Sequence, residues 1–236
     1  MKAVETRNLR KVYKSGEIEV EALSEVSLDV PEGDFLLVSG PSGSGKTTLL
    51  NVLGALDLPT SGSISIFERD ISSLSDDDLS DLRLRTIGFV FQAYNLIATL
   101  TAYENIEFPM VLSNMSPEER SNKVEDLLRL VDLENRAGNK PDQLSGGEQQ
   151  RIAVARALSN DPKMILADEP TGNLDSRSSD RVFELLKKVN SELGVTIIAV
   201  SHDPRFMHHC KRGVVIEDGR IVDEGPSASW ANRDQM

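Results

Sequence analysis

The chain has 236 residues, enough to bury a sizeable core in one or two domains. It is 39% hydrophobic and 27% charged, which is typical of an ordinary globular protein and not of a disordered or fibrous one. Its formal net charge of −12 argues against a nucleic acid as the main partner, because phosphate backbones bind to basic faces.

The single cysteine, Cys210, excludes an intramolecular disulfide and fits the cytosol. The N-terminal stretch MKAVETRNLRK has no apolar run, so we do not expect a signal peptide. No segment approaches the ~18 to 20 apolar residues that cross a bilayer. We therefore expect any membrane role to depend on a partner.

The first part of the chain predicts strands. Short β-branched or apolar runs occupy residues 4–9, 25–30 and 35–39, and charged residues and glycine separate them. The third run leads through a glycine-rich loop into a helix at about 47–56. The alternating stretch SISIF at 63–67 predicts one more strand.

From about residue 75 the pattern becomes helical. Ser75 and Asp78 have the spacing of a capping box, so we interpret the acidic run 76–78 as a helix N-terminus and not as a metal site. A second helical stretch begins near Leu100. Ser116-Pro117-Glu118-Glu119 predicts a third helix start, and a fourth helix runs from Gly147 to about Ser159.

The last part alternates between strand and helix again. Apolar runs at 164–168 and 195–201 predict strands, with a helix at 176–193 between them and a short helix after the second. Asp218-Gly219 between two apolar runs predicts a β-hairpin. We expect a catalytic α/β core at 1–92 and 161–225, a helical block at 93–160 and a polar tail at 226–236.

Residues 40–48, GPSGSGKTT, match the P-loop pattern G-x-x-x-x-G-K-[ST] at every fixed position. Glycines let backbone N–H groups approach phosphate oxygens, and the next helix adds its positive end. Lys46 supplies a mobile charge for the β and γ phosphates, and Thr47 offers a hydroxyl to Mg²⁺. The predicted nucleotide-binding residues are Gly40, Pro41, Ser42, Gly43, Ser44, Gly45, Lys46, Thr47 and Thr48.

A magnesium site needs further oxygen ligands, and the stretch KMILADEP supplies a carboxylate. Asp168 ends a buried strand, at the edge where open α/β sheets bind ligands, so it is the predicted metal ligand. Glu169 is one step further along. We predict that it orients the attacking water and accepts its proton.

A second glycine pair stands in LSGGEQQ at 144–150. Ser145 and Glu148 have capping-box spacing, so Ser145 is the predicted N-cap of a helix that begins with Gly146 and Gly147. The same N-terminus could bind an anion, because its N–H groups are free and glycines put no side chain in the way. The residues by themselves allow either a cap or a phosphate.

The P-loop, LSGGEQQ, ILADEP and a late SHD at 201–203, in this order, resemble an ATP-binding cassette, the nucleotide-binding subunit of an ABC transporter. The resemblance covers about residues 2–225. It implies an ABC ATPase fold: a P-loop α/β core with a mixed sheet, an N-terminal antiparallel β-subdomain and an inserted α-helical subdomain. It also implies ATP hydrolysis with Mg²⁺.

The resemblance assigns roles to four further residues. Tyr13 is similar to the aromatic that stacks on adenine, and Gln92 to the Q-loop glutamine that reaches Mg²⁺ or the attacking water. His202 is similar to the histidine that contacts the γ-phosphate, and Asp175 to the D-loop aspartate. Asn173 departs from the serine or alanine that many cassettes carry at this position.

The resemblance also decides between the two readings of LSGGEQQ. In this family two copies meet head to tail, so residues 145–148 of one chain would close over the nucleotide on the P-loop of the other. The implied partners are a second copy and an integral membrane permease, with the cassette held on the cytoplasmic face of the membrane.

Residues 89–109 together with ADEPTGNLDS resemble the macrolide-export and lipoprotein-release branch. The cassette of the cell-division system carries similar sequence motifs and is an alternative within the family. A soluble ABC-type ATPase of iron–sulfur assembly is the alternative from a different functional class. A small-molecule kinase would have no use for LSGGEQQ. The cluster His208, His209 and Cys210 lacks a fourth ligand and a matching spacing, so no metal site is expected there.

Overall fold

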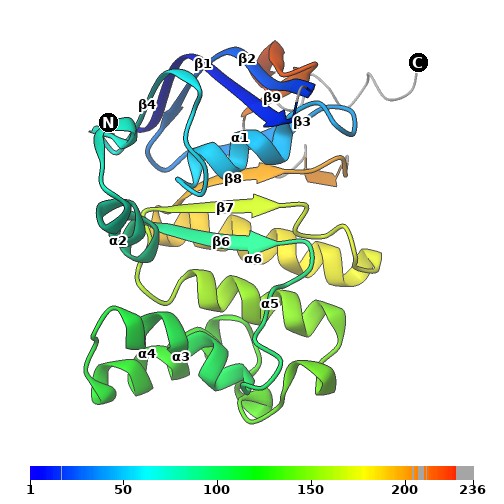
Figure 1. Ribbon diagram of the computed structural model, residues 1–236. Helices are drawn as coiled ribbons and strands as arrows, with labels where there is room; N and C mark the ends of the chain where they lie inside the picture. The colour runs from blue at the N-terminus through cyan, green and yellow to red at the C-terminus, as the bar shows by residue number, and fades with distance from the viewer. Residues whose placement is uncertain (17, 204, 207–209, 211, 227–236) are drawn as a thin grey trace.

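Two β-sheets lie above a block of helices (Figure 1). This computed structural model describes residues 1–236 except 17, 204, 207–209, 211 and 227–236. The pair His208 and His209 and nearly all of the predicted polar tail therefore lie outside the described residues. Of the short helix predicted after the run 195–201, the structure describes Arg205 and Phe206, which are helical.

The first sheet is antiparallel and has the strand order β2-β1-β4-β5. Its strands are β1 (Lys2–Ser15), β2 (Ile18–Pro31), β4 (Ser61–Ile66) and β5 (Arg69–Asp70). The strands β1 and β2 extend well beyond the predicted runs 4–9 and 25–30, and Tyr13 pairs with Val20 in the added part. That part is mostly exposed, so it carries little of the alternation that a half-buried strand shows.

The second sheet is mixed, with the order β10-β9-β3-β8-β7-β6. Its strands are β3 (Phe35–Ser39), β6 (Ile87–Phe91), β7 (Met164–Asp168), β8 (Thr196–Val200), β9 (Arg212–Glu217) and β10 (Arg220–Pro226). All neighbours are parallel except β9 and β10, which form the predicted hairpin. The parallel strands therefore end at one common edge.

The six described α-helices are α1 (Lys46–Leu53), α2 (Asp76–Thr86), α3 (Ala102–Leu112), α4 (Pro117–Leu130), α5 (Gly146–Ala157) and α6 (Ser176–Leu193). The predicted caps are confirmed: the hydroxyl groups of Ser75, Ser116 and Ser145 accept bonds from the N–H groups three residues later. Each cap satisfies one N–H that the helix itself cannot pair, which fixes where the helix begins.

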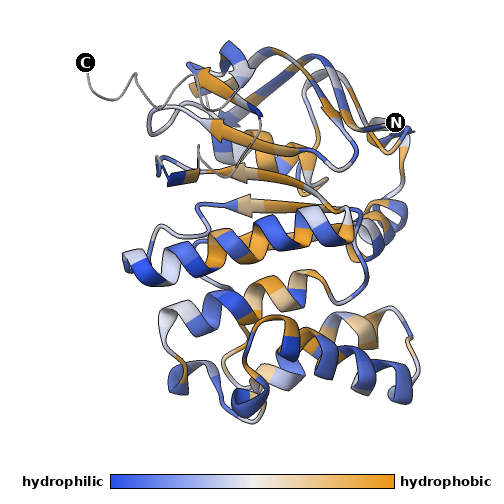
Figure 2. Ribbon diagram, turned by 180° about the vertical axis from the view of Figure 1, so that it is seen from behind, coloured by the Kyte–Doolittle hydropathy of each residue, from blue (hydrophilic) through white to orange (hydrophobic). Residues whose placement is uncertain are grey.

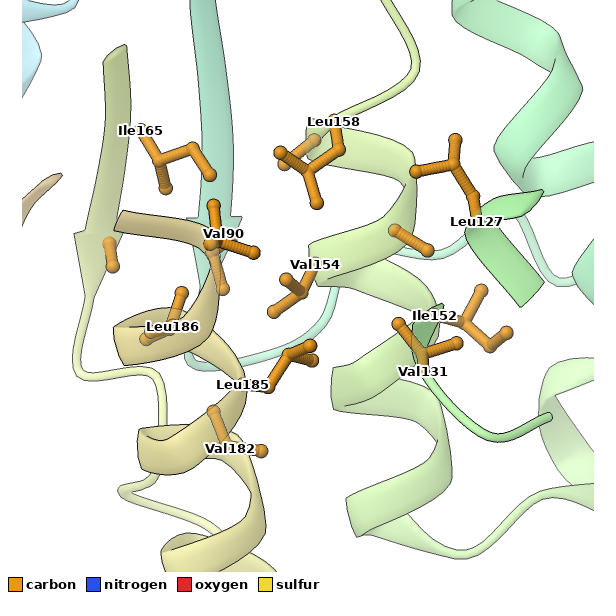
Figure 3. Packing of buried hydrophobic residues seen from close by; sticks show 14 of the residues in the cluster. Val90, Leu127, Val131, Ile152, Val154, Leu158, Ile165, Val182, Leu185 and Leu186 are labelled. Carbon is orange, nitrogen blue, oxygen red and sulfur yellow. The ribbon is translucent and has the colours of Figure 1, made fainter. Parts of the chain in front are cut away.

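Side chains that alternate along each central strand divide the core into two clusters. Leu36 and Val38 of β3 join a cluster with α1 and the first sheet, whereas Phe35 and Leu37 join a cluster with α3 to α6. Figure 3 shows the second cluster, where Val90 and Ile165 of the sheet face Val154 of α5 and Leu186 of α6. Helices α1 and α5 thus lie on opposite faces of the mixed sheet (Figure 1).

The helix α6 packs against the sheet through one apolar face. Its inward face is orange and its outward face blue in Figure 2, and Val182, Phe183 and Leu186 are fully buried. This is the pattern of an amphipathic helix packed on a core. Within the described part of the chain, every helix is too short or too polar to cross a lipid bilayer.

Candidate active site

A cavity of about 620 Å³ lies at the edge where the parallel strands end. The strand β3 leads into the P-loop, β6 into Gln92 and β8 toward His202, while β7 ends at Asp168. Its lining residues are Val20, Glu21, Ala22, Gly40, Ser42, Gly43, Gly45, Lys46, Thr47, Thr48, Gln92, Asp168, Glu169, Val200 and His202. Side chains distant in sequence thus meet at one place because their strands run in the same direction.

The P-loop glycines serve two purposes. A Cβ at Gly40 would lie 2.0 Å from the carbonyl oxygen of Ile216, and one at Gly45 would lie 2.4 Å from that of Ala22. These two glycines let the loop pack against β9 and β2. A Cβ at Gly43 would meet nothing within 4 Å, and its φ of +78° favours glycine, so this glycine faces open space.

Lys46 is nearly buried, and its ammonium group is held by the loop itself. Its Nζ donates to the carbonyl oxygens of Gly40 at 2.8 Å and Pro41 at 2.7 Å. The buried hydroxyl of Ser44 in the same loop has no hydrogen-bond partner among the described residues. A cation, an unpaired hydroxyl and a helix N-terminus around open space fit a bound phosphate chain.

The predicted metal ligands offer only oxygen-bearing side chains. The side chains of Thr47, Asp168 and Gln92 all line the cavity. Burial raises the pKa of the Asp168 carboxyl, while the Thr47 hydroxyl and the Lys46 ammonium act against the rise. Hydroxyl, carboxylate and amide oxygens fit Mg²⁺, which prefers oxygen ligands.

Glu169 follows β7 in a conformation that is unusual for a residue with a side chain. Its φ is +44°, and its N–H donates to the carbonyl oxygen of Val200 at 2.9 Å. One carboxylate oxygen, Oε1, lies 2.8 Å from His202 Nδ1. The Glu169 side chain is 16% exposed and that of His202 is 74% exposed, so the carboxylate is sheltered beside an accessible imidazole.

Tyr13 and Asp175 do not line the cavity. The Tyr13 hydroxyl donates to Asp57 at 2.9 Å, which holds a ring that is 40% exposed, and burial raises the pKa of the phenol. Asp175 is the N-cap of α6: its carboxylate accepts from the N–H and the hydroxyl of Ser178. The strand β2, which pairs with the part of β1 that carries Tyr13, lines the cavity through residues 20–22.

Residues 145–148 are also absent from the cavity lining. They begin α5, on the opposite face of the sheet from α1 (Figure 1). Ser145 and Glu148 form a complete capping box, with bonds of 2.8 and 3.3 Å. The two phosphate-binding patterns of the sequence are therefore separate in one chain.

The glycines of this second pattern are packed within their own chain. A Cβ at Gly146 would lie 2.7 Å from the Tyr94 hydroxyl, and one at Gly147 would lie 2.7 Å from Ser178 Oγ. The absence of a side chain thus allows α5 to contact both the segment after β6 and the start of α6. Close packing against Tyr94 and Ser178 therefore requires glycine at positions 146 and 147, whether or not a phosphate also approaches them.

Gly147→Ala is expected to lower the free energy of unfolding by about 1–3 kcal/mol, because the new methyl group overpacks the contact with Ser178. Ser178→Gly removes the atoms in its way, so the double variant should lose less than the sum of the two single losses. Urea unfolding of the four proteins measures this coupling. Additive losses would show that the packing at Gly147 is not tight.

Sequence reasoning missed two parts of the site. Residues 20–22 were not predicted as strand, and only the long β1–β2 pairing brings them to the P-loop. The sequence predicts no role for Asn173, whose side chain contacts Gln92 across 81 residues of sequence. The only sequence signal for this contact is the amide side chain of Asn173, at a position where many cassettes carry serine or alanine.

The comparisons with known proteins agree with this geometry. The family model described as ABC transporter matches residues 23–172. An uncharacterized ABC transporter ATP-binding protein of Thermotoga maritima is 48% identical over 220 residues, which cover 93% of this chain and 94% of that protein. A macrolide export ATP-binding/permease protein, MacB, of Mannheimia succiniciproducens is 45% identical over 95% of this chain but only 35% of its own length.

A solved structure gives the same fold. The cassette MJ0796, whose sequence is that of an uncharacterized ABC transporter ATP-binding protein of Methanocaldococcus jannaschii, superimposes with a TM-score of 0.88 at 45% identity. The match covers 95% of this chain and 98% of that one, in a dimeric post-hydrolysis structure bound to ADP and Pi. The expected ABC ATPase fold is confirmed, and the chain belongs to the ABC transporter family as an ATP-binding, ATP-hydrolysing subunit.

Proposed function

We propose that two copies of this chain form a head-to-tail dimer that binds two ATP molecules and drives a membrane permease. The observation that carries the proposal is the separation of the two anion sites. The cavity holds the P-loop, Asp168 and Glu169, and residues 145–148 lie elsewhere in the same chain. A second copy related by a twofold axis would supply the missing capped helix to each cavity.

In each cavity, the N–H groups of residues 40–48 and the Lys46 ammonium would bind the β and γ phosphates. Lys46 must then exchange the carbonyl oxygens of Gly40 and Pro41 for phosphate oxygens. Tyr13 is proposed to stack on the adenine. Thr47, Asp168 and Gln92 would hold Mg²⁺, which supplies neutralising charge for the phosphates when it is bound.

Glu169 is the proposed general base. It would take a proton from a water molecule that attacks the γ-phosphorus, so that an O–P bond forms, the bond to the β-phosphate oxygen breaks, and ADP and phosphate result. His202 already contacts Glu169 Oε1, so the imidazole can hold the carboxylate in place and reach the γ-phosphate. Burial of Glu169 limits competing hydration of its carboxylate.

The dimer would be held by the nucleotide. The γ-phosphate would lie between the P-loop of one copy and the N-terminus of α5 of the other, where Ser145, Gly146, Gly147 and Glu148 begin the helix. Asp175 would lie close to the same interface at the start of α6. The dimeric structures of MJ0796 support a dimer of this chain. Cleavage removes the bridging group, so the copies separate as rigid bodies.

A groove of about 290 Å³ between the α/β core and the helical block is the proposed permease contact. It begins next to Gln92, and its lining includes Phe89 and Phe91 of β6, Pro109 of α3 and Arg156 of α5. Beyond Pro109, the side chains of Val111 and Leu112 are 44% and 56% exposed. An exposed apolar surface beside the groove along β6, the strand that leads into Gln92, fits a partner contact.

We propose an integral membrane permease as this partner, in the macrolide-export and lipoprotein-release branch, which would hold the chain on the cytoplasmic face of the membrane. The names of the MacB relatives support the branch. Cross-linking and purification of the tagged chain from its own membranes tests the proposal. Recovery of a macrolide-export or lipoprotein-release permease supports it, whereas a soluble iron–sulfur scaffold or a cell-division permease as the only partner would contradict it.

Leu112→Asp is expected to weaken permease binding by about 10-fold or more, because a charge replaces an exposed apolar contact. Leu193→Asp is a matched control, since both leucines are 56% exposed and both end a helix. Permease pull-down and basal ATPase rates are measured for both variants. Equal binding by the two variants would exclude this surface, and basal hydrolysis should be unchanged in both.

A further inference from the structure

Asn173 lies in the turn between β7 and α6 and is paired with Gln92, which follows β6. The Asn173 Nδ2 donates to the backbone carbonyl oxygen of Gln92 at 3.1 Å. In return, the Gln92 Nε2 donates to Asn173 Oδ1 at 3.4 Å. One amide side chain thus contacts both the backbone and the side chain of Gln92.

The pair decides which end of the Gln92 amide is free. An amide carries two donors on nitrogen and an acceptor on oxygen, and a half-turn of the group exchanges them. Asn173 accepts from the nitrogen, and a Cβ at the neighbouring Gly172 would lie only 2.7 Å from the same Nε2. The nitrogen side is therefore packed against residues 172–173, and the oxygen is left for the cavity that Gln92 lines.

The chemistry of the site requires this orientation. A metal ion takes an amide by its oxygen and not by its NH₂ group, and a water that attacks phosphorus must lose a proton toward an acceptor. With the amide reversed, Gln92 would present two N–H donors to a site that already contains Lys46. A free side chain would lose rotamer entropy each time it had to be ordered for this contact.

We propose that Asn173 is a positioning residue that fixes the Gln92 amide with its oxygen toward the metal and the attacking water. This inference rests on the proposed role of Gln92 and adds a residue to which the family resemblance gives no role. It also connects the segment after β6 with the turn that leads to Asp175. Cassettes with serine or alanine at this position would then lack this contact, and their Gln92 equivalent would be less restrained.

The test compares Asn173→Ala, Asn173→Asp and Gln92→Ala with the double variant Gln92→Ala/Asn173→Ala. Mn²⁺ affinity is measured by EPR in the presence of a non-hydrolysable ATP analogue, and nucleotide affinity is measured separately in EDTA. Asn173→Ala should weaken Mn²⁺ binding about 3- to 10-fold, in line with the loss of one to two hydrogen bonds. Nucleotide affinity in EDTA should stay within about 2-fold, which a general structural defect would not allow.

Asn173→Asp keeps the acceptor but loses the donor, and it places a carboxylate oxygen beside the Gln92 carbonyl, so it should be at least as defective as Asn173→Ala. In the Gln92→Ala background, Asn173→Ala should have no further effect. A loss in Gln92→Ala without one in Asn173→Ala would overturn this inference and leave the proposed function intact. No loss in Gln92→Ala would instead contradict the proposed metal contact of Gln92.

Discussion

Glu169→Gln is expected to slow ATP hydrolysis about 10²- to 10⁴-fold while ATP binding is retained, as for the loss of a general base. The amide oxygen of glutamine can still accept from His202 Nδ1, so the local contact of 2.8 Å can persist. The unusual φ of +44° is equally available to both residues. Steady-state phosphate release and nucleotide binding give the two quantities.

The slowed variant should also accumulate as a dimer when ATP and Mg²⁺ are present, because the bridging phosphate is no longer removed. Size-exclusion chromatography with and without ATP measures this. Glu125→Gln, an exposed change on α4, is the matched control and should hydrolyse ATP normally. A Glu169→Gln protein that hydrolyses within about 3-fold of the parent would show that another group accepts the proton.

Ser145→Asp is expected to abolish turnover almost completely, by about 10²-fold or more, because it places a carboxylate where the partner's γ-phosphate would lie. Aspartate is as good an N-cap as serine, so the start of α5 should be preserved. Ser145→Asn is the neutral, nearly isosteric control, and it should retain much of the activity. Hydrolysis rates and unfolding midpoints of the three proteins separate a charge effect from a folding defect.

Mixing provides a stricter test of the same residue. Lys46→Ala should be inactive because its P-loop lacks the charge that binds phosphate. A mixed dimer of Ser145→Asp and Lys46→Ala chains contains one site with both defects and one intact site. Equal mixing should therefore restore about a quarter of the parent activity, since half of the dimers are mixed and each has one of two sites. Complete inactivity of a mixture shown to contain mixed dimers would contradict sites shared between chains.

The sequence predicted most of the α/β core because its local signals agree with one another. Strands β3, β7 and β8 are continuous apolar runs, as expected for strands covered on both faces, and serine caps mark several helix starts. The pattern 40–48 and the carboxylates after β7 follow these strands directly. Parallel pairing then brings them to one edge, so the sequence order was enough to place them.

The sequence could not predict contacts that depend on tertiary packing. The outer parts of β1 and β2 are exposed and charged, and only their pairing with each other places residues 20–22 at the P-loop. The glycines of LSGGEQQ were explained by phosphate alone, whereas their approach to Tyr94 and Ser178 follows from how α5 sits on its neighbours. The contact between Asn173 and Gln92 has the same origin.

The central claim is that each ATP site is shared between two chains. The most direct measurement is a structure of Glu169→Gln with ATP and Mg²⁺. The account predicts that Ser145 Oγ and the N–H groups of Gly146 and Gly147 of one copy lie within about 3.5 Å of the γ-phosphate that Lys46 of the other copy binds. A dimer with ATP in both P-loops and residues 145–147 more than about 10 Å from either γ-phosphate, beyond any hydrogen bond, would contradict it.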